Sequence, residues 1–182
     1  MKRLTSIFAL ISCALVFSGC AAFSPPPLNK SEMTPNDPAL VFKSTGKSLA
    51  FGEFSGPKAK GDNIYLVTTF DLRDVLAQSL EKSQLFSTVA TEPNPKADYT
   101  LTASIMGEPG KGVFTITSSL IVKYEIIRNA TGEVVFSKTI FGKHTVSTGQ
   151  EFVGATRARM SVQGAVKDNV TQLLKDISQL KL

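Results

Sequence analysis

The chain has 182 residues, of which 42% are hydrophobic and 19% are charged, and its formal net charge is +5 at pH 7. No run of Lys and Arg with interleaved aromatic residues is present, so the composition supports neither nucleic-acid binding nor strong electrostatic capture by anionic headgroups. Both cysteines, Cys13 and Cys20, lie at the N-terminus, which leaves no thiol pair for a disulfide or a thiolate metal site in a folded domain.

The N-terminus has the layout of an export signal. Lys2 and Arg3 precede the apolar stretch 7–17, which small residues follow. This stretch has eleven residues, whereas a helix that spans a bilayer needs about 20 apolar residues. We therefore predict that residues 1–19 are a signal peptide that is removed after export.

The segment Phe17-Ser18-Gly19-Cys20 resembles the bacterial lipobox. This resemblance implies cleavage between Gly19 and Cys20 and acylation of Cys20 with chains such as palmitate. Ala21 follows the cysteine, where an aspartate would signal retention at the inner membrane, so the resemblance implies a lipid anchor on the periplasmic face of the outer membrane. The alternative is an ordinary signal peptide with an incidental cysteine.

Residues 20–46 are rich in Pro, Ser, Asn and Thr and show no sustained hydrophobic period. Proline fixes the backbone φ angle and removes an amide donor, so the three consecutive prolines at 25–27 favour an extended chain. We predict that 20–46 is a lipidated cysteine followed by a tether. The remaining residues, 47–182, are enough for one periplasmic domain with its own core.

The start of this domain predicts a strand followed by a helix. The apolar run at 48–54, which a Gly-Pro pair closes, is typical of a strand. From 68 to 86, apolar residues recur at helical spacing and form one stripe of Leu72, Val75, Leu76 and Leu80. Thr68 and Asp71 have the spacing of an N-terminal capping box.

The second half of the chain predicts four further strands and a closing helix. A short strand is expected at 86–91, and alternation of apolar and polar residues predicts a strand at 97–105. Residues 113–128 alternate in the same way, and an Asn-Ala-Thr-Gly turn joins them to 133–144 as an antiparallel hairpin. Helical spacing returns at 156–180.

This order of elements predicts an α+β fold. We expect a mainly antiparallel sheet of about five strands, with two amphipathic helices packed on one face. The opposite face is rich in Thr, Ser and Lys, so we expect it to be solvated or to hold a partner.

The sequence offers little for catalysis or metal binding. His144 is the single histidine, so a Ser-His-Asp centre, a Cys-His centre or a His/Cys metal cluster would have to be built around it. Asp71 and Asp74 could face the same way on one helix, but an acid–base role would need a cleft. The glycine-rich 107–112 lacks the spacing of a phosphate loop and predicts a turn. We therefore predict no catalytic residue, no metal ligand and no cofactor, and we expect that the protein is not an enzyme.

Two arginines are expected to precede the last helix. Arg157 and Arg159 lie where the positive end of the helix dipole makes cations slightly unfavourable. This mismatch makes both residues candidates for contact with a partner. The alternative is a solvated basic end of a loop.

The element order, the hairpin at 124–136 with Thr131-Gly132-Glu133 at its turn, and the closing helix resemble a group of small periplasmic lipoproteins. They are the α/β lipoproteins of the curli-secretion (CsgG), PelC, penicillin-binding-protein-activator (LpoB) and YajG types. The resemblance spans about 47–182 and implies a non-enzymatic accessory that docks onto envelope machinery or self-associates. It carries over no functional residue except Cys20.

These features predict an outer-membrane lipoprotein that serves as an accessory, assembly or binding module of a cell-envelope complex. The alternative is a carrier of a lipid or other apolar ligand in a groove between helices and sheet, which a cavity lined by Phe114, Val122 or Leu173 would favour. An enzyme that acts on envelope polymers is a third class, and it would need convergent polar side chains in a pocket, near His144 or the acidic helix positions.

Overall fold

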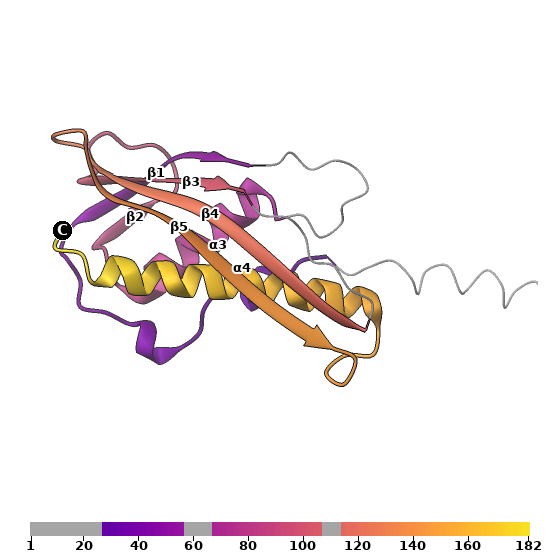
Figure 1. The fold of residues 1–182 in the computed structure, drawn as a ribbon. Helices are drawn as coiled ribbons and strands as arrows, with labels where there is room; N and C mark the ends of the chain where they lie inside the picture. Colours follow the sequence, from indigo (N-terminus) through magenta and orange to yellow (C-terminus); the bar gives the residue numbers. More distant parts are fainter. Residues whose placement is uncertain (1–26, 57–66, 107–113) are drawn as a thin grey trace, which may run out of the picture.

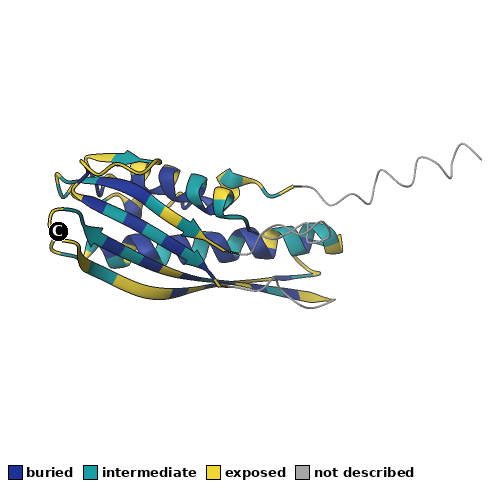
Figure 2. Cartoon of the chain, turned by 90° about the horizontal axis from the view of Figure 1, so that it is seen from above, coloured by how far each residue is buried: buried dark blue, intermediate teal, exposed yellow. Residues whose placement is uncertain are grey.

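The computed structural model describes residues 27–56, 67–106 and 114–182. These residues form a five-stranded sheet in the order β2-β1-β3-β4-β5, and helices α3 and α4 lie side by side on one face of it (Figures 1 and 2). The predicted α+β class, with a sheet of about five strands, is confirmed. The elements are α2 (Lys30–Met33), η2 (Pro38–Leu40), β1 (Ser48–Ser55), α3 (Thr69–Ser83), β2 (Thr88–Ala90), β3 (Tyr99–Ile105), β4 (Thr115–Arg128), β5 (Glu133–Ser147) and α4 (Gly154–Ser178).

The sheet is mixed, although most of its paired length is antiparallel. β3, β4 and β5 pair antiparallel, whereas β1 pairs parallel with both β2 and β3. The crossover through α3 makes β2 parallel to β1. β2 has only three residues, so it ends close to the start of β1. A short loop then leads to β3 on the other side of β1, where Tyr99 pairs with Leu49.

Helix α3 begins where its capping box predicts. The Thr68 hydroxyl accepts from the amide of Asp71 over 3.1 Å, and the Asp71 carboxylate accepts from the amide of Thr68 over 3.1 Å. The apolar stripe of α3 is buried against the sheet. Gln84 ends the helix in the left-handed region, with a φ of 57°.

The β4–β5 hairpin is the longest feature of the sheet. β4 has 14 residues and β5 has 15, and they pair from Thr115 and Ser147 at one end to Arg128 and Glu133 at the other. Gly132 has a φ of +71° in the turn, a conformation that favours glycine. The part of β4 before Val122 extends beyond its pairing with β3, and α4 packs along both hairpin strands.

The core lies between the sheet and the two helices. Alternate residues of β3 and β4 face the helices and are buried, in agreement with the predicted two-residue period. α4 contributes a stripe of Val162, Val166, Val170, Leu173 and Ile177 to the same core. Within the described ranges, no helix combines the length and the apolar character that crossing a membrane requires.

Residues 27–46 differ from the extended tether that composition indicated. This segment packs on the domain through α2 and η2, and Met33 and Leu40 are buried in the main core. Phe42 N also donates to Ser83 O over 2.9 Å, which ties the segment to the end of α3. The folded part therefore includes residues from 27 onward, whereas 20–26 of the predicted tether lie outside the described residues.

Candidate functional site

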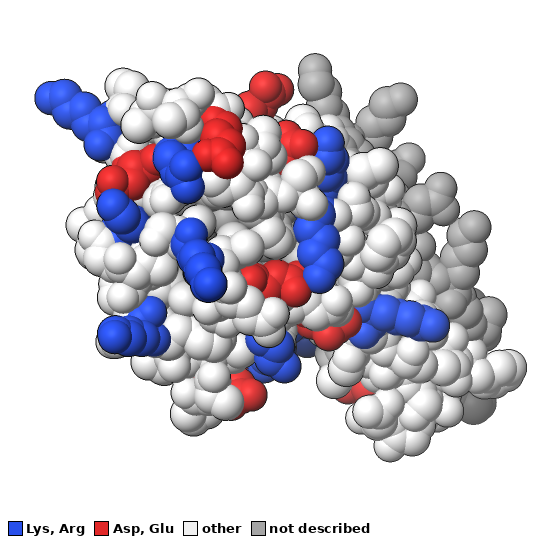
Figure 3. Space-filling model, turned by 60° about the vertical axis from the view of Figure 1, so that its left-hand side comes forward, with Lys and Arg blue, Asp and Glu red and all other residues white. Residues whose placement is uncertain are grey.

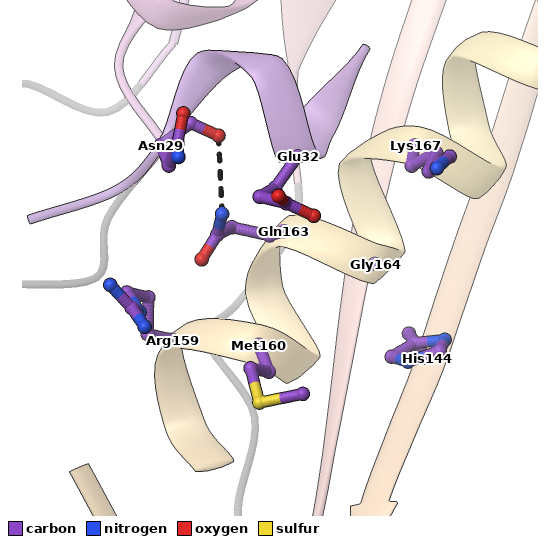
Figure 4. Close-up of a pocket in the computed structure, with 8 residues that line it drawn as sticks. All are labelled: Asn29, Glu32, His144, Arg159, Met160, Gln163, Gly164 and Lys167. Carbon is purple, nitrogen blue, oxygen red and sulfur yellow. Dashed lines mark hydrogen bonds between the residues drawn. The ribbon is translucent and has the colours of Figure 1, made fainter. Parts of the chain in front are cut away.

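A pocket opens where α2 crosses α4 beside the end of β5 (Figure 4). Its volume is about 440 Å³, and its lining comes from three elements that are far apart in the sequence. The lining residues are Asn29, Glu32, His144, Arg159, Met160, Gln163, Gly164 and Lys167.

Backbone proximity and one hydrogen bond shape this pocket. Gln163 Nε2 donates to Asn29 O over 3.1 Å, which fixes α2 on α4. A Cβ atom on Gly164 would lie 2.2 Å from His144 Cγ, so only glycine lets the imidazole lie against the helix. His144 itself pairs with Ser118 in the hairpin and therefore projects toward α4 rather than toward the open face of the sheet.

The charged groups of the pocket favour an anionic ligand group. Arg159 and Lys167 supply two cations and Glu32 one carboxylate, and none of the three takes part in an ion pair among the described residues. Arg159 Nε is buried without a hydrogen-bond partner in the described part of the chain. An unsatisfied buried donor costs about 1–3 kcal/mol, and the two cations of the pocket suit a ligand carboxylate or phosphate.

The two arginines that the sequence singled out occupy different environments. α4 begins at Gly154, so both lie within its first turns and not before it. Arg157 is buried, and its Nη1 donates to Glu151 O over 2.8 Å and to Phe152 O over 2.5 Å. Arg157 therefore holds the loop before α4, whereas Arg159 lines the pocket. Gly19 and Cys20 lie outside the described residues.

The acidic pair on α3 has structural roles. Asp71 caps the helix, and Asp74 forms an ion pair with Lys30 of α2. The hydrogen bond to Asp74 raises the pKa of Lys30 above its usual range. Within the ranges that the structure describes, no group of three His, Cys, Asp or Glu residues is placed to hold a metal ion.

Sequence reasoning missed Asn29 and Glu32 because it treated the segment that contains α2 as tether. Asn29 followed three residues later by Glu32 is a helix-start pattern that would have predicted α2. The Asn29 side chain indeed accepts from Ser31 N over 3.1 Å as an N-cap. Lys167 could not be predicted as a pocket residue, because the pocket forms only where α2 packs on α4.

The three residues expected to line an apolar cavity do not lie together in one. Val122 and Leu173 have no exposed surface and belong to the packed core, whereas Phe114 is 77% exposed at the start of β4. Packed interiors leave little room for a ligand. These positions therefore give no specific support to a carrier role.

No protein-family model and no curated protein matches this chain. Solved structures do resemble it. Protein XCC0632 from Xanthomonas campestris, a DUF330 protein, is 15% identical with a TM-score of 0.57, over 81% of this chain and 90% of that one. A Helicobacter pylori protein named as a homolog of a neuraminyllactose-binding hemagglutinin is 11% identical with a TM-score of 0.52, over 85% and 93%.

The likeness is one of fold. A PelC dodecamer from Paraburkholderia phytofirmans is also similar, at 15% identity and a TM-score of 0.41, over 69% of this chain and 89% of that one. The first two structures establish that the α+β arrangement described above is one that natural proteins adopt.

Proposed function

We propose that the chain is a lipoprotein anchored through Cys20 to the periplasmic face of the outer membrane. Its domain would act as a non-enzymatic accessory or binding module of a cell-envelope complex. The observation that carries this proposal is Phe17-Ser18-Gly19-Cys20, which lies at the end of the apolar stretch 7–17. An exported leader and an acylation site at this spacing account for the N-terminus together.

The pocket supports the binding part of the proposal. Arg159, Met160 and Lys167 all line the pocket, so it combines cationic groups with an apolar side chain. Such a surface suits an acidic side chain or terminus of a protein partner. We propose that Arg159 is the residue that contacts this group and that Arg157 contributes by holding the preceding loop.

Replacement of the cysteine tests the anchor. Cys20→Ala should move the protein out of the membrane fraction and remove the acyl mass from the mature N-terminus. Cys13→Ala is the matched control, because that residue leaves with the predicted leader and its loss should change neither result. Unchanged membrane retention of the Cys20→Ala protein, without acyl groups on the wild-type N-terminus, would contradict the anchor.

Site-specific photo-cross-linking tests the binding role. A photoreactive amino acid at Met160, beside Arg159, should capture an envelope protein in intact cells, and Arg159→Glu in the same chain should abolish the capture by charge reversal. The same probe at Lys96, an exposed loop position away from α4, is the control. Equal capture at both positions, or capture that Arg159→Glu does not change, would count against this surface.

A further inference from the structure

Exposed apolar side chains gather at one end of the β4–β5 hairpin. Phe114 comes directly before β4, and Phe152 and Val153 come directly before α4; their exposed fractions are 77%, 87% and 55%. Thr148 N donates to Phe114 O over 3.1 Å, which keeps the loop after β5 beside the start of β4. Exposed apolar groups that cluster mark interaction surfaces. We call these three residues the apolar tip.

The backbone of the tip is held in place although its side chains are exposed. The buried Arg157 donates to Glu151 O and Phe152 O, and Val153 N donates to the Glu151 carboxylate over 2.8 Å. A side chain on a fixed backbone loses less conformational freedom when a partner covers it. The fixed backbone therefore lowers the conformational entropy that the tip loses on binding.

The described chain enters the domain near the same end. Asn29 O accepts a hydrogen bond from Gln163 Nε2. Gln163 lies ten residues after Val153 on α4, which corresponds to about 15 Å at the rise of a helix. Figure 1 shows the start of the described chain beside this half of α4. Seven residue steps separate Cys20 from Pro27, which span at most about 25 Å when extended. Acyl chains on Cys20 would therefore keep this end close to a bilayer.

The charges at this end do not oppose contact with a phospholipid surface. The first fourteen residues of α4, 154–167, contain three basic and no acidic residues. The Glu151 carboxylate is engaged by Val153 N, and the start of α4 is the positive end of its dipole. By contrast, the face toward the C-terminus mixes Lys and Arg with Asp and Glu (Figure 3).

We propose that the apolar tip docks on the bilayer that carries the acyl anchor, with Phe114, Phe152 and Val153 in its interfacial region. This inference rests on the proposed anchor at Cys20 and adds an orientation to it. Amphipathic surfaces of this kind bind at the boundary between headgroups and acyl chains. The anchor makes the second contact intramolecular, so a small apolar surface is enough. In this orientation α4 rises from the membrane and the C-terminal end faces away from it.

Tryptophan fluorescence tests this orientation, because the chain contains no tryptophan. Phe152→Trp places a single fluorophore at the tip, and Phe114→Trp gives an independent second position. Val134→Trp is the control, since Val134 is 51% exposed near the other end of the hairpin, about 40 Å away along β5. Each acylated protein is reconstituted into vesicles of phosphatidylethanolamine and phosphatidylglycerol, with and without brominated phospholipid, after circular dichroism has verified folding.

We expect the tryptophan emission to be blue-shifted at both tip positions and to be quenched at least twofold by brominated lipid. We expect neither the blue shift nor the quenching for Val134→Trp. Water-exposed, unquenched emission at both tip positions would overturn the docking. A blue shift that grows with protein concentration and that brominated lipid leaves unquenched would also overturn it, and would assign the tip to a second copy of the chain. An N-terminus without acyl mass would instead overturn the proposed anchor, and with it this inference.

Discussion

The phenol of Tyr124 in β4 donates to Asn169 Oδ1 in α4 over 2.8 Å, in the middle of the core. Asn169 Nδ2 in turn donates to Leu120 O and Ile140 O, so one amide joins the helix to both strands of the hairpin. Both side chains are completely buried, and burial raises the pKa of Tyr124 far above its usual range. The phenol therefore remains a neutral donor.

This bond predicts unequal losses of stability. Tyr124→Phe should lower the free energy of unfolding by about 1–3 kcal/mol, because it leaves Asn169 Oδ1 buried without a donor. Asn169→Ala should cost more, since it removes all three bonds and opens a cavity. Urea denaturation of both variants and of the double variant measures the coupling, which should be at least about 0.5 kcal/mol. Strictly additive losses would show that the pair acts as two independent residues.

The approach of α4 to β5 depends on Gly142. A Cβ atom at this position would lie 2.1 Å from Ala165 O and 2.6 Å from Asn169 Cβ, and neither neighbour is the free end of a flexible side chain. Gly142→Ala should therefore cost about 3 kcal/mol or more by thermal or urea denaturation, because the helix must move. Gly149→Ala is the control, since its nearest neighbour would be 3.7 Å away. Similar losses in the two variants would contradict this account.

Residues 27–46 are predicted to be part of the cooperative fold. Met33 has no exposed surface, and its side chain belongs to the main core. Met33→Ala should cost about 2–5 kcal/mol and expose the segment to protease. Val41→Ala, at a position that is 54% exposed, should cost less than about 0.5 kcal/mol. If Met33→Ala left stability unchanged, the segment would be a tether that only rests on the domain.

Met33 also shows where sequence patterns stop being informative. Helix α3 could be predicted because its stripe and its Thr68–Asp71 cap are local signals within one segment. A helix of four residues such as α2 has no measurable period, so its burial depends on the space that α3 and α4 leave. In the same way, the parallel pairing of Leu49 with Tyr99 joins residues fifty positions apart, and nothing in either strand specifies it.

The candidate site also contains one residue that a local sequence signal indicated and others that only packing brings together. Arg159 could be chosen from the sequence because a cation near the positive end of a helix dipole is slightly unfavourable, and this is a local property. Its pocket depends on Glu32 and Lys167, which come together only through packing. The apolar tip was hidden for the opposite reason: Phe114 fits the alternation of β4, but it lies before the strand begins and is exposed.

Asp98 predicts a dependence of stability on acid pH. Its carboxylate accepts from Ser48 N over 2.8 Å and from Ser48 Oγ over 2.7 Å. The backbone bond first, and then the hydroxyl bond, lower the pKa of Asp98 below its usual range. A lowered folded-state pKa stabilises the fold fully above the unfolded value of about 3.9, and this contribution is lost as pH falls through the folded value.

The measurement is urea denaturation of the wild type and Asp98→Asn from pH 2.5 to pH 7. The difference in stability between the two proteins should be constant above about pH 5 and should shrink below about pH 4. Glu81→Gln, on the exposed side of α3, controls for the loss of a surface carboxylate. If the difference in stability did not change with pH, the hydrogen bonds from Ser48 would not favour the ionised form of Asp98 over the protonated form.

β5 forms one edge of the described sheet, and the unpaired backbone of an edge strand can bind another copy of the chain. Two side chains of α4 occupy its outward backbone groups: Lys143 N donates to Asp168 Oδ2 over 2.9 Å, and Gln172 Nε2 donates to Phe141 O over 3.0 Å. Gln172 also donates to Asp168 over 3.1 Å, which aligns the two. The helix therefore blocks strand addition at the middle of the edge.

Removal of both groups should expose this edge. The double variant Asp168→Ala and Gln172→Ala should remain folded but should sediment as larger species than the parent protein, in proportion to concentration, because free N–H and C=O groups template strand pairing. The matched control is Thr171→Ala with Lys175→Ala, on the same helix. Analytical ultracentrifugation distinguishes the two, and identical sedimentation of variant and control would mean that another feature protects the edge.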